Sequence, residues 1–354
     1  ETPAPGLDGT DGDGTILITG GTGQLGRIIA RHLASTRPTP HLALVSRTGP
    51  HTPDADELLT ELAALGTHAT LHACDTTDPH ALRTLLTELT THRPLHGIIH
   101  TAGALDDATI TSLTPTHLHH TLAPKADTAW HLHHLTQQLG ITPHYFVLFS
   151  SASGLIGGPG QANYAAANVF LDALAHHRHT HHLPAQSLGW GPWQPTTGMT
   201  AQLTTTDHDR LTRNGLLTLT PEQGTRLFDT AQTTPHPTLW PMPLDRTTLR
   251  DTPHAPPILR TLIPTTHTTT TPTIPLTQRL TGLTHTDQHQ LLLTLIKQEA
   301  ATVLHHTHPD QLTDTTAFTA LGFDSLTAVE LRNRLTTLTQ TPLPATLLFD
   351  HPTP

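Results

Sequence analysis

Residues 15–26 have the sequence TILITGGTGQLG, and this stretch decides the class of fold. TILITG (15–20) is an apolar run of strand length, and QLGRIIARHLAS after the glycines has the apolar spacing of an amphipathic helix. A G-x-G-x-x-G pattern thus lies between a strand and a helix, where it permits a tight turn and brings the backbone close to a pyrophosphate. We expect a dinucleotide-binding loop rather than a plain glycine-rich turn, formed by Thr19, Gly20, Gly21, Thr22, Gly23, Gln24, Leu25 and Gly26.

Strands and helices alternate beyond this loop. Apolar segments typical of strands follow at 42–47, 68–75, 96–103, 145–151 and 185–190, and helical patterns cover 54–65, roughly 115–139, and 163–177. Continuous apolar strands between amphipathic helices are typical of a parallel sheet covered on both faces. We therefore predict an α/β fold with a Rossmann-like, doubly wound parallel sheet.

The pattern changes near residue 265. THTTTTPTIPLTQ (266–278) is rich in Thr and Pro and is typical of a semi-extended linker. We predict a flexible lead-in at 1–14, a catalytic domain at 15–264, a linker at 265–284 and a small all-α bundle at 285–354. That bundle is expected to contain a helix at about 287–305, a second helix starting at Ser325 and a short third element near PATLLFD. The apolar face of its first helix is expected to hold Leu291, Leu292, Leu295, Ile296 and Val303.

Composition excludes several classes of protein. The formal charge is −10 with only 13% charged residues, and no basic face indicates a nucleic-acid partner. No apolar run reaches membrane-spanning length. A lone cysteine, Cys74, excludes an internal disulfide and fits a reducing compartment, so we expect a cytoplasmic protein.

Histidine is unusually common, at 31 residues. Clusters at 131–134 and 176–179 raise the question of a metal site, but no paired spacing recurs beside cysteines or carboxylates. We expect no metal, with histidine and threonine replacing other polar residues on solvated helix faces. The charge of such a protein is expected to change strongly near pH 6.

The end of the second strand selects the nucleotide. An acidic residue there would bind the ribose 2′-hydroxyl of NAD, but this chain has Ser46 and Arg47. An arginine can pair with a 2′-phosphate, which favours NADPH, although Arg47 alone is also compatible with an ordinary surface residue. Asp75, after the third strand, either bonds the adenine edge or caps the next turn.

Tyr164 and Ser151 share the connection between the fifth strand and its helix. A tyrosine can donate a proton to a carbonyl oxygen while hydride arrives from a nicotinamide. A tyrosine's ordinary pKa near ~10 is too high for easy exchange at neutral pH, so a nearby cation helps. A serine hydroxyl can hold the same oxygen as negative charge develops.

FSSASG and NYAAAN after TGGTGQLG resemble the short-chain dehydrogenase/reductase superfamily, and specifically the ketoreductase domains of modular type I polyketide synthases. Ordinary members of the superfamily carry Tyr-x-x-x-Lys, whereas this chain has Asn168 one helical turn after Tyr164. The resemblance assigns the lysine to Lys125, on the preceding long helix. It thereby implies a catalytic set of Tyr164, Ser151, Lys125 and Asn168, and it assigns Thr101, Ala102 and Gly103 to the cofactor site.

HTAGALDD (100–107) carries a finer resemblance. Leu105, Asp106 and Asp107 are similar to the fingerprint of B-type ketoreductases, which give a D-3-hydroxyl, and Ile156 replaces the tryptophan typical of the A-type. Pro159 resembles a subgroup linked to one α-substituent configuration. SLGWGPW (187–193) resembles the approach to a substrate lid, although its two tryptophans equally fit a core.

LGFDSL (321–326) and the apolar-periodic helix after it resemble the attachment site of acyl carrier domains. A helix N-terminus favours a phosphodiester anion, so an exposed serine there suits phosphopantetheine. The resemblance assigns the arm to Ser325; the alternative is a helix N-cap.

Together these resemblances imply an NADPH-dependent reductase of a carrier-bound β-ketoacyl thioester. Expected partners are the ketosynthase and acyltransferase domains of the same synthase, a phosphopantetheinyl transferase, and a second copy in a homodimer. A redox-silent scaffold and a free-standing reductase of small alcohols are the alternatives; the intact catalytic set argues against the first, and the LDD and GFDSL phrases against the second.

Two departures from the family concern the ends of the chain. We expect a segment of a longer polypeptide, without the upstream structural half and the last carrier helix, and with a composition that resembles the mycolactone synthases. The missing half is expected to stabilise the sheet edge.

Overall fold

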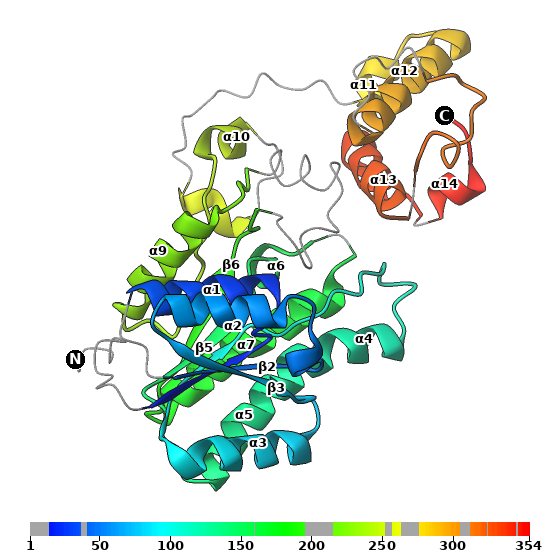
Figure 1. The fold of residues 1–354 in the computed structure, drawn as a ribbon. Helices are drawn as coiled ribbons and strands as arrows, with labels where there is room; N and C mark the ends of the chain where they lie inside the picture. The colour runs from blue at the N-terminus through cyan, green and yellow to red at the C-terminus, as the bar shows by residue number, and fades with distance from the viewer. Residues whose placement is uncertain are drawn as a thin grey trace. The chain divides into compact units, whose positions relative to one another are not determined.

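A computed structural model of the chain describes residues 14–36, 41–158, 160–194, 215–251, 257–262, 276–304, 312–323, 325–344 and 346–354. The chain divides into two compact units, Glu1–Ile263 and Pro264–Pro354 (Figure 1). The predicted lead-in, apart from Gly14, and most of the predicted linker lie outside the described residues.

The first unit is built on one parallel sheet in the order β3-β2-β1-β4-β5-β6-β7. The reversal of strand order between β1 and β4 is the switch point at which doubly wound folds bind their ligands. The predicted Rossmann-like fold is confirmed. The strands are β1 Thr15–Thr19, β2 His41–Ser46, β3 His68–Ala73, β4 Leu95–His100, β5 Tyr145–Ser151, β6 Gln186–Trp190 and the unpredicted two-residue β7 Thr238–Leu239.

Helices cover both faces of this sheet because successive strand side chains point to opposite sides. One core cluster joins α1 (Gln24–Thr36), α2 (Ala55–Ala64) and α9 (Pro221–Gln232) to side chains such as Ile18 and Val147. The other joins α3 (Pro79–His92), α5 (Thr128–Gln138) and α7 (Ala162–Thr180) to side chains such as Leu17 and Phe146. Figure 1 shows α1 and α3 on opposite sides of the strands. The smaller elements are η2 Gly49–His51, α6 Ser153–Ile156, α10 Arg246–Asp251 and η5 Pro257–Leu262.

The segment predicted as one long helix at 115–139 is divided into three. α4 (Pro115–Leu122) and α5 are joined by a π-helical turn, η3 (Ala123–Asp127), in which the Thr128 amide N–H bonds to the Ala123 carbonyl. Isolated π turns inside longer helices are frequent at functional sites. This one contains Lys125.

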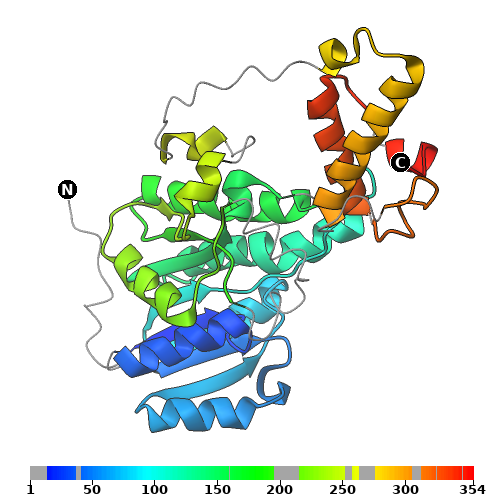
Figure 2. The same cartoon turned by 90° about the horizontal axis from the view of Figure 1, so that it is seen from above.

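The second unit is helical, as predicted for a carrier domain. It contains α11 (Leu276–Leu280), α12 (His285–Leu304), α13 (Ser325–Thr339) and α14 (Leu347–Asp350), with α12 and α13 side by side (Figure 2). α11 falls inside the segment predicted as linker. Leu295 and Val303 of the predicted apolar face are buried, and Leu331 of α13 belongs to the same unit's core.

Candidate active site

The glycine-rich loop joins β1 to α1 at the switch point of the sheet. Gly20 has a φ of +68°, a conformation that favours glycine. A Cβ on Gly26 would lie 2.3 Å from the Gly20 carbonyl oxygen, so only glycine allows α1 to start this close to the loop. The first turn of α1 has no acidic residue to repel an anion. The loop therefore fits the pyrophosphate of a dinucleotide, as the sequence predicts.

The end of β4 completes the wall beside this loop. Thr101 donates its backbone N–H and its hydroxyl to the Thr19 carbonyl, at 3.0 and 2.8 Å. A Cβ on Gly20 would lie 2.8 Å from the Ala102 backbone nitrogen. Residues 101–103 and the glycine loop thus form one continuous backbone surface.

The residues predicted to select the nucleotide lie at the ends of β2 and β3. Arg47 is exposed, and its charge contributes to lowering the pKa of Asp75. The larger cause is Thr77, whose hydroxyl and amide N–H donate to the Asp75 carboxylate at 2.7 and 3.0 Å. Asp75 thus caps its own turn through one carboxylate oxygen, Oδ1. Ser46 accepts a hydrogen bond from the Gly49 N–H.

The lysine and the tyrosine meet although they lie on different elements. Lys125 is buried, its ammonium donates to the Phe149 carbonyl at 2.9 Å, and its Nζ lies 5.3 Å from the centroid of the Tyr164 ring. The interaction is therefore a cation–π contact between a buried lysine and a half-buried tyrosine. Ser151 ends β5 nearby and accepts a hydrogen bond from the Ser153 N–H.

Asn168 lies one turn of α7 beyond Tyr164 and is fully buried. Its amide donates to the Tyr164 carbonyl at 2.7 Å, while its Oδ1 has no hydrogen-bond partner. Buried acceptors without partners are rare and often mark a functional site. The Asn168 side chain is therefore fixed beside Tyr164 by its amide alone.

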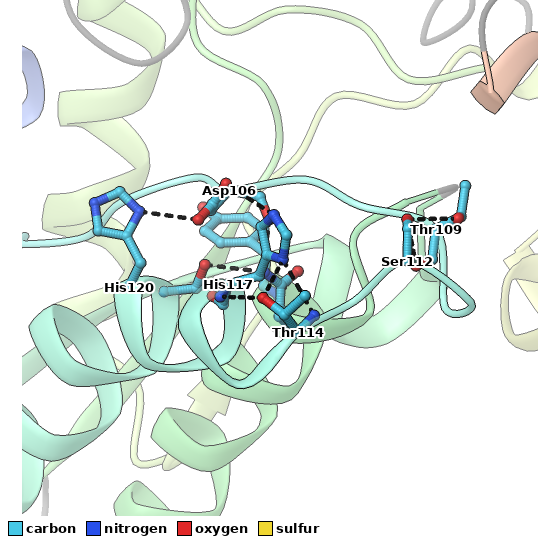
Figure 3. Close-up of polar contacts among 9 residues, drawn as sticks. Asp106, Thr109, Ser112, Thr114, His117 and His120 are labelled. Carbon is cyan, nitrogen blue, oxygen red and sulfur yellow. Dashed lines mark hydrogen bonds and ion pairs between the residues drawn. The ribbon is translucent and has the colours of Figure 1, made fainter.

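The loop at 105–107 is held by the segment that precedes Tyr164. The Asn163 amide donates to the Asp106 carbonyl at 2.8 Å, and the Gln161 amide donates to the Asp107 carboxylate at 2.9 Å. The Asp106 carboxylate faces α4, where His120 Nδ1 lies 3.3 Å away and His117 Nε2 3.9 Å away (Figure 3). This role of Asn163 could not be predicted from the sequence, because an amide beside a tyrosine has no diagnostic spacing.

Two further predictions concern Pro159 and the two tryptophans of SLGWGPW. Pro159 is outside the described residues. Trp190 and Trp193 are 4% and 3% exposed and pack against each other in the core, 5.1 Å between ring centroids. They are core aromatics, the second of their two interpretations.

The histidines do not all lie on solvated faces. His41, His100 and His133 are buried, and burial lowers their pKa values to about 4, 3 and 4 respectively. These three will not contribute to the charge change expected near pH 6. Within the described ranges, no three His, Cys, Asp or Glu side chains gather as metal ligands.

Ser325 is the first residue of α13. The loop before it is anchored by Phe318 and Phe323, whose buried rings meet edge to face at 5.2 Å. Phe318 also donates its N–H to the Pro352 carbonyl at 2.8 Å. The described part of the loop, up to Phe323, is therefore attached to the unit's core and to its C-terminal segment.

A parallel sheet with a glycine loop beside a buried lysine and a tyrosine defines a dinucleotide-dependent reductase. Residues 14–195 match the KR domain family, and residues 294–354 match the phosphopantetheine attachment site family. The chain belongs to the ketoreductases of modular type I polyketide synthases and continues into a carrier domain. It is thus an oxidoreductase segment of such a synthase.

Relatives support this assignment over nearly the whole chain. Polyketide synthase GfsB of Streptomyces halstedii is 49% identical over 97% of this chain, and mycoketide-CoA synthase of Mycobacterium tuberculosis is 47% identical over 98%. The matched region is only 6% and 9% of those proteins. A solved A-type ketoreductase from a modular polyketide synthase is 39% identical with a TM-score of 0.62, covering 69% of this chain and 51% of that one. In the part of the chain that the structure describes, no helix has the length and apolarity needed to cross a membrane.

Proposed function

We propose that this chain uses NADPH to reduce a β-ketoacyl thioester, carried on its own second unit, to a 3-hydroxyacyl thioester. The observation that carries the proposal is the buried Lys125 ammonium, 5.3 Å from the centre of the Tyr164 ring. A cation in that place favours the anionic form of the tyrosine that proton donation leaves behind. The proposal rests on the side chains of both residues.

Each protein group has a distinct part in the reaction. NADPH, when bound at the glycine loop, supplies the hydride that reduces the ketone carbon. Tyr164 donates its phenolic proton to the carbonyl oxygen, and Ser151 donates a hydrogen bond to that oxygen as negative charge develops. Lys125 stabilises the resulting phenolate. Asn168, which donates to the Tyr164 carbonyl, is assigned to the relay through which the phenol regains a proton.

NADPH is preferred to NADH because of the charge at the end of β2. Arg47 is exposed there, and no carboxylate occupies the position that binds a ribose 2′-hydroxyl. A guanidinium can pair with the 2′-phosphate in a bidentate manner. The remaining cofactor contacts are assigned to the glycine loop, to Ser46 and Asp75, and to residues 101–103.

We assign the product a D-3-hydroxyl. The fold is shared with A-type ketoreductases, so the assignment rests on Leu105, Asp106 and Asp107. This segment is attached through Asn163 and Gln161 to the stretch that leads into Tyr164. A side chain here can therefore orient a substrate directly at the proton donor. Pro159 is assigned an accessory part in stereocontrol on the resemblance alone.

The carrier function is assigned to Ser325. Its place at the start of α13 provides an anion-favouring helix end for the phosphodiester. Loading requires a phosphopantetheinyl transferase, and the acyl chain comes from ketosynthase and acyltransferase domains of the same synthase. We further propose domain boundaries at 15–264 and 285–354, a homodimeric synthase and a cytoplasmic location.

The test is cofactor consumption with a short β-ketoacyl thioester. We expect NADPH to be oxidised much faster than NADH, and Tyr164→Phe to abolish the reaction while NADPH still binds. Equal use of the two cofactors would contradict the role of Arg47. Normal turnover by Tyr164→Phe would contradict the proton donor.

A further inference from the structure

His100 ends β4 between the cofactor loop and the lysine, and it is completely buried. Its Nδ1 lies 2.6 Å from the Thr19 hydroxyl, at the end of β1. Its Nε2 lies 2.9 Å from the Lys125 carbonyl oxygen. One imidazole therefore connects the strand that enters the glycine loop to the backbone that carries the catalytic lysine.

The two partners fix how this imidazole is protonated. A carbonyl oxygen can only accept, so Nε2 must carry a hydrogen and donate it to Lys125. Burial lowers the pKa of His100 to about 3, and the nearby Lys125 charge acts in the same direction. The ring is therefore neutral at working pH, and Nδ1 accepts from the Thr19 hydroxyl.

The carbonyl that His100 holds lies in an unusual backbone segment. Lys125 is the middle residue of the π-helical turn Ala123–Asp127. A π turn disturbs the regular helix ladder. Here the Lys125 carbonyl accepts from the Thr128 N–H inside the helix and also lies within hydrogen-bond distance of His100 outside it. His100 contacts the carbonyl group of the same residue whose side chain carries the catalytic ammonium.

The same lysine is fixed at its other end by the Phe149 carbonyl. The two contacts together hold both the backbone and the ammonium of Lys125. A shift of the π turn would change the distance between the Lys125 ammonium and the Tyr164 ring. Errors of about 1 Å in such groups cost roughly 100-fold in rate.

We propose that His100 is a positioning residue for reduction: it holds the π turn so that Lys125 lies beneath Tyr164 while the cofactor loop stays in register. It touches neither substrate nor cofactor and acts through Lys125 and Thr19. The inference deepens the proposed function and depends on it for the kinetic readout.

Two substitutions separate the two hydrogen bonds. In His100→Gln, the side-chain amide can still donate from near the Nε2 position; in His100→Asn, the shorter amide reaches only the region of Nδ1. We expect His100→Asn to lower kcat at least about tenfold with little change in KM for the thioester, and His100→Gln to recover most of that loss. The alkaline limb of the kcat profile, which the proton donor sets, is expected to move in His100→Asn and to stay in place in His100→Gln.

His41 provides a matched control. It is also buried and bonded to two hydroxyls, those of Thr15 and Thr70, but it begins β2 at the opposite end of the sheet. His41→Asn is expected to lower the melting temperature without moving the pH limb. If His100→Asn changes only the melting temperature, or if His100→Gln fares no better than His100→Asn, His100 is merely structural and the proposal is wrong.

Imidazole nitrogen NMR on the full chain tests the same idea without turnover. Several buried histidines are expected to stay neutral from about pH 8 to about pH 5, and we expect the one whose signals disappear in His100→Gln to be protonated at Nε2. A charged or Nδ1-protonated His100 would overturn the proposal even if reduction proceeds. A wild-type chain that shows the expected tautomer but no NADPH oxidation would instead contradict the proposed function.

Discussion

Replacing Lys125 by methionine removes the ammonium while keeping an unbranched side chain of similar length. Over the 5.3 Å from Nζ to the Tyr164 ring centre, a unit charge pair at an effective dielectric constant of about 20 interacts by about 3 kcal/mol. Losing that stabilisation of the phenolate corresponds to a decrease in kcat of at least about 100-fold. The Phe149 carbonyl also loses its donor, which costs about 1–3 kcal/mol of stability. The cost of burying a charge disappears at the same time, so the stability change is expected to be small beside the kinetic one.

The assay is single-turnover reduction of a β-ketoacyl thioester, with the melting temperature measured on the same samples. Lys297→Met is the control, because Lys297 pairs with Asp314 in the second unit. It is expected to leave reduction of a free thioester unchanged. The reasoning is refuted if Lys125→Met retains kcat within about threefold of the wild type, or if its kcat loss follows only the unfolded fraction.

Further outcomes follow from other contacts. The free energy of unfolding is expected to fall as the pH drops from about 6.5 towards about 4, because the buried neutral histidines take up protons at their ordinary pKa only when the chain unfolds. A urea midpoint that is the same at about pH 7 and about pH 5 would contradict the lowered pKa values of His41, His100 and His133. Ser325→Ala is expected to prevent phosphopantetheine loading, seen by intact mass, while exposed Ser112→Ala loads normally; loading of the first variant would remove the carrier assignment. His120→Ala is expected to lower the D-to-L product ratio about twofold, since an exposed pair such as the one with Asp106 contributes about 0.5 kcal/mol. His119→Ala is its control, and an unchanged ratio in His120→Ala would show that the pair does not orient the loop at 105–107.

The architecture of the first unit was predictable because its strands are long apolar runs. TILITG and YFVLFSS have no competing interpretation once helices alternate with them. β7 could not be predicted, since a two-residue strand has no period of its own. The break of the long helix at Ala123–Asp127 was also missed, because a π turn does not interrupt the apolar pattern. α3 was passed over although Asp78 and Pro79 provide an N-cap and a first-turn proline.

The site was only partly predictable from the residues themselves. The glycine loop has a local signature, but Lys125 and Tyr164 lie far apart in the chain, and only the resemblance to ketoreductases paired them. The structure brings both together at the carboxyl ends of β4 and β5. The number of residues between Lys125 and Tyr164 does not predict that meeting. His100 was quoted only within a motif, because a strand residue does not reveal what its side chain will meet across the sheet. Burial of His41 and His133 was unforeseen for the same reason.

The most direct test of the account is to load Ser325 with a β-ketoacyl phosphopantetheine, add NADPH, and release the acyl group for mass and chiral analysis. The account predicts gain of two hydrogens on the tethered chain and a D-3-hydroxyl, with no reduction in Tyr164→Phe. An L-3-hydroxyl would retain the ketoreductase but contradict the assignment from Leu105, Asp106 and Asp107. A ketone that stays intact on a loaded carrier with NADPH bound would contradict the central claim that this chain reduces its own carrier-bound substrate.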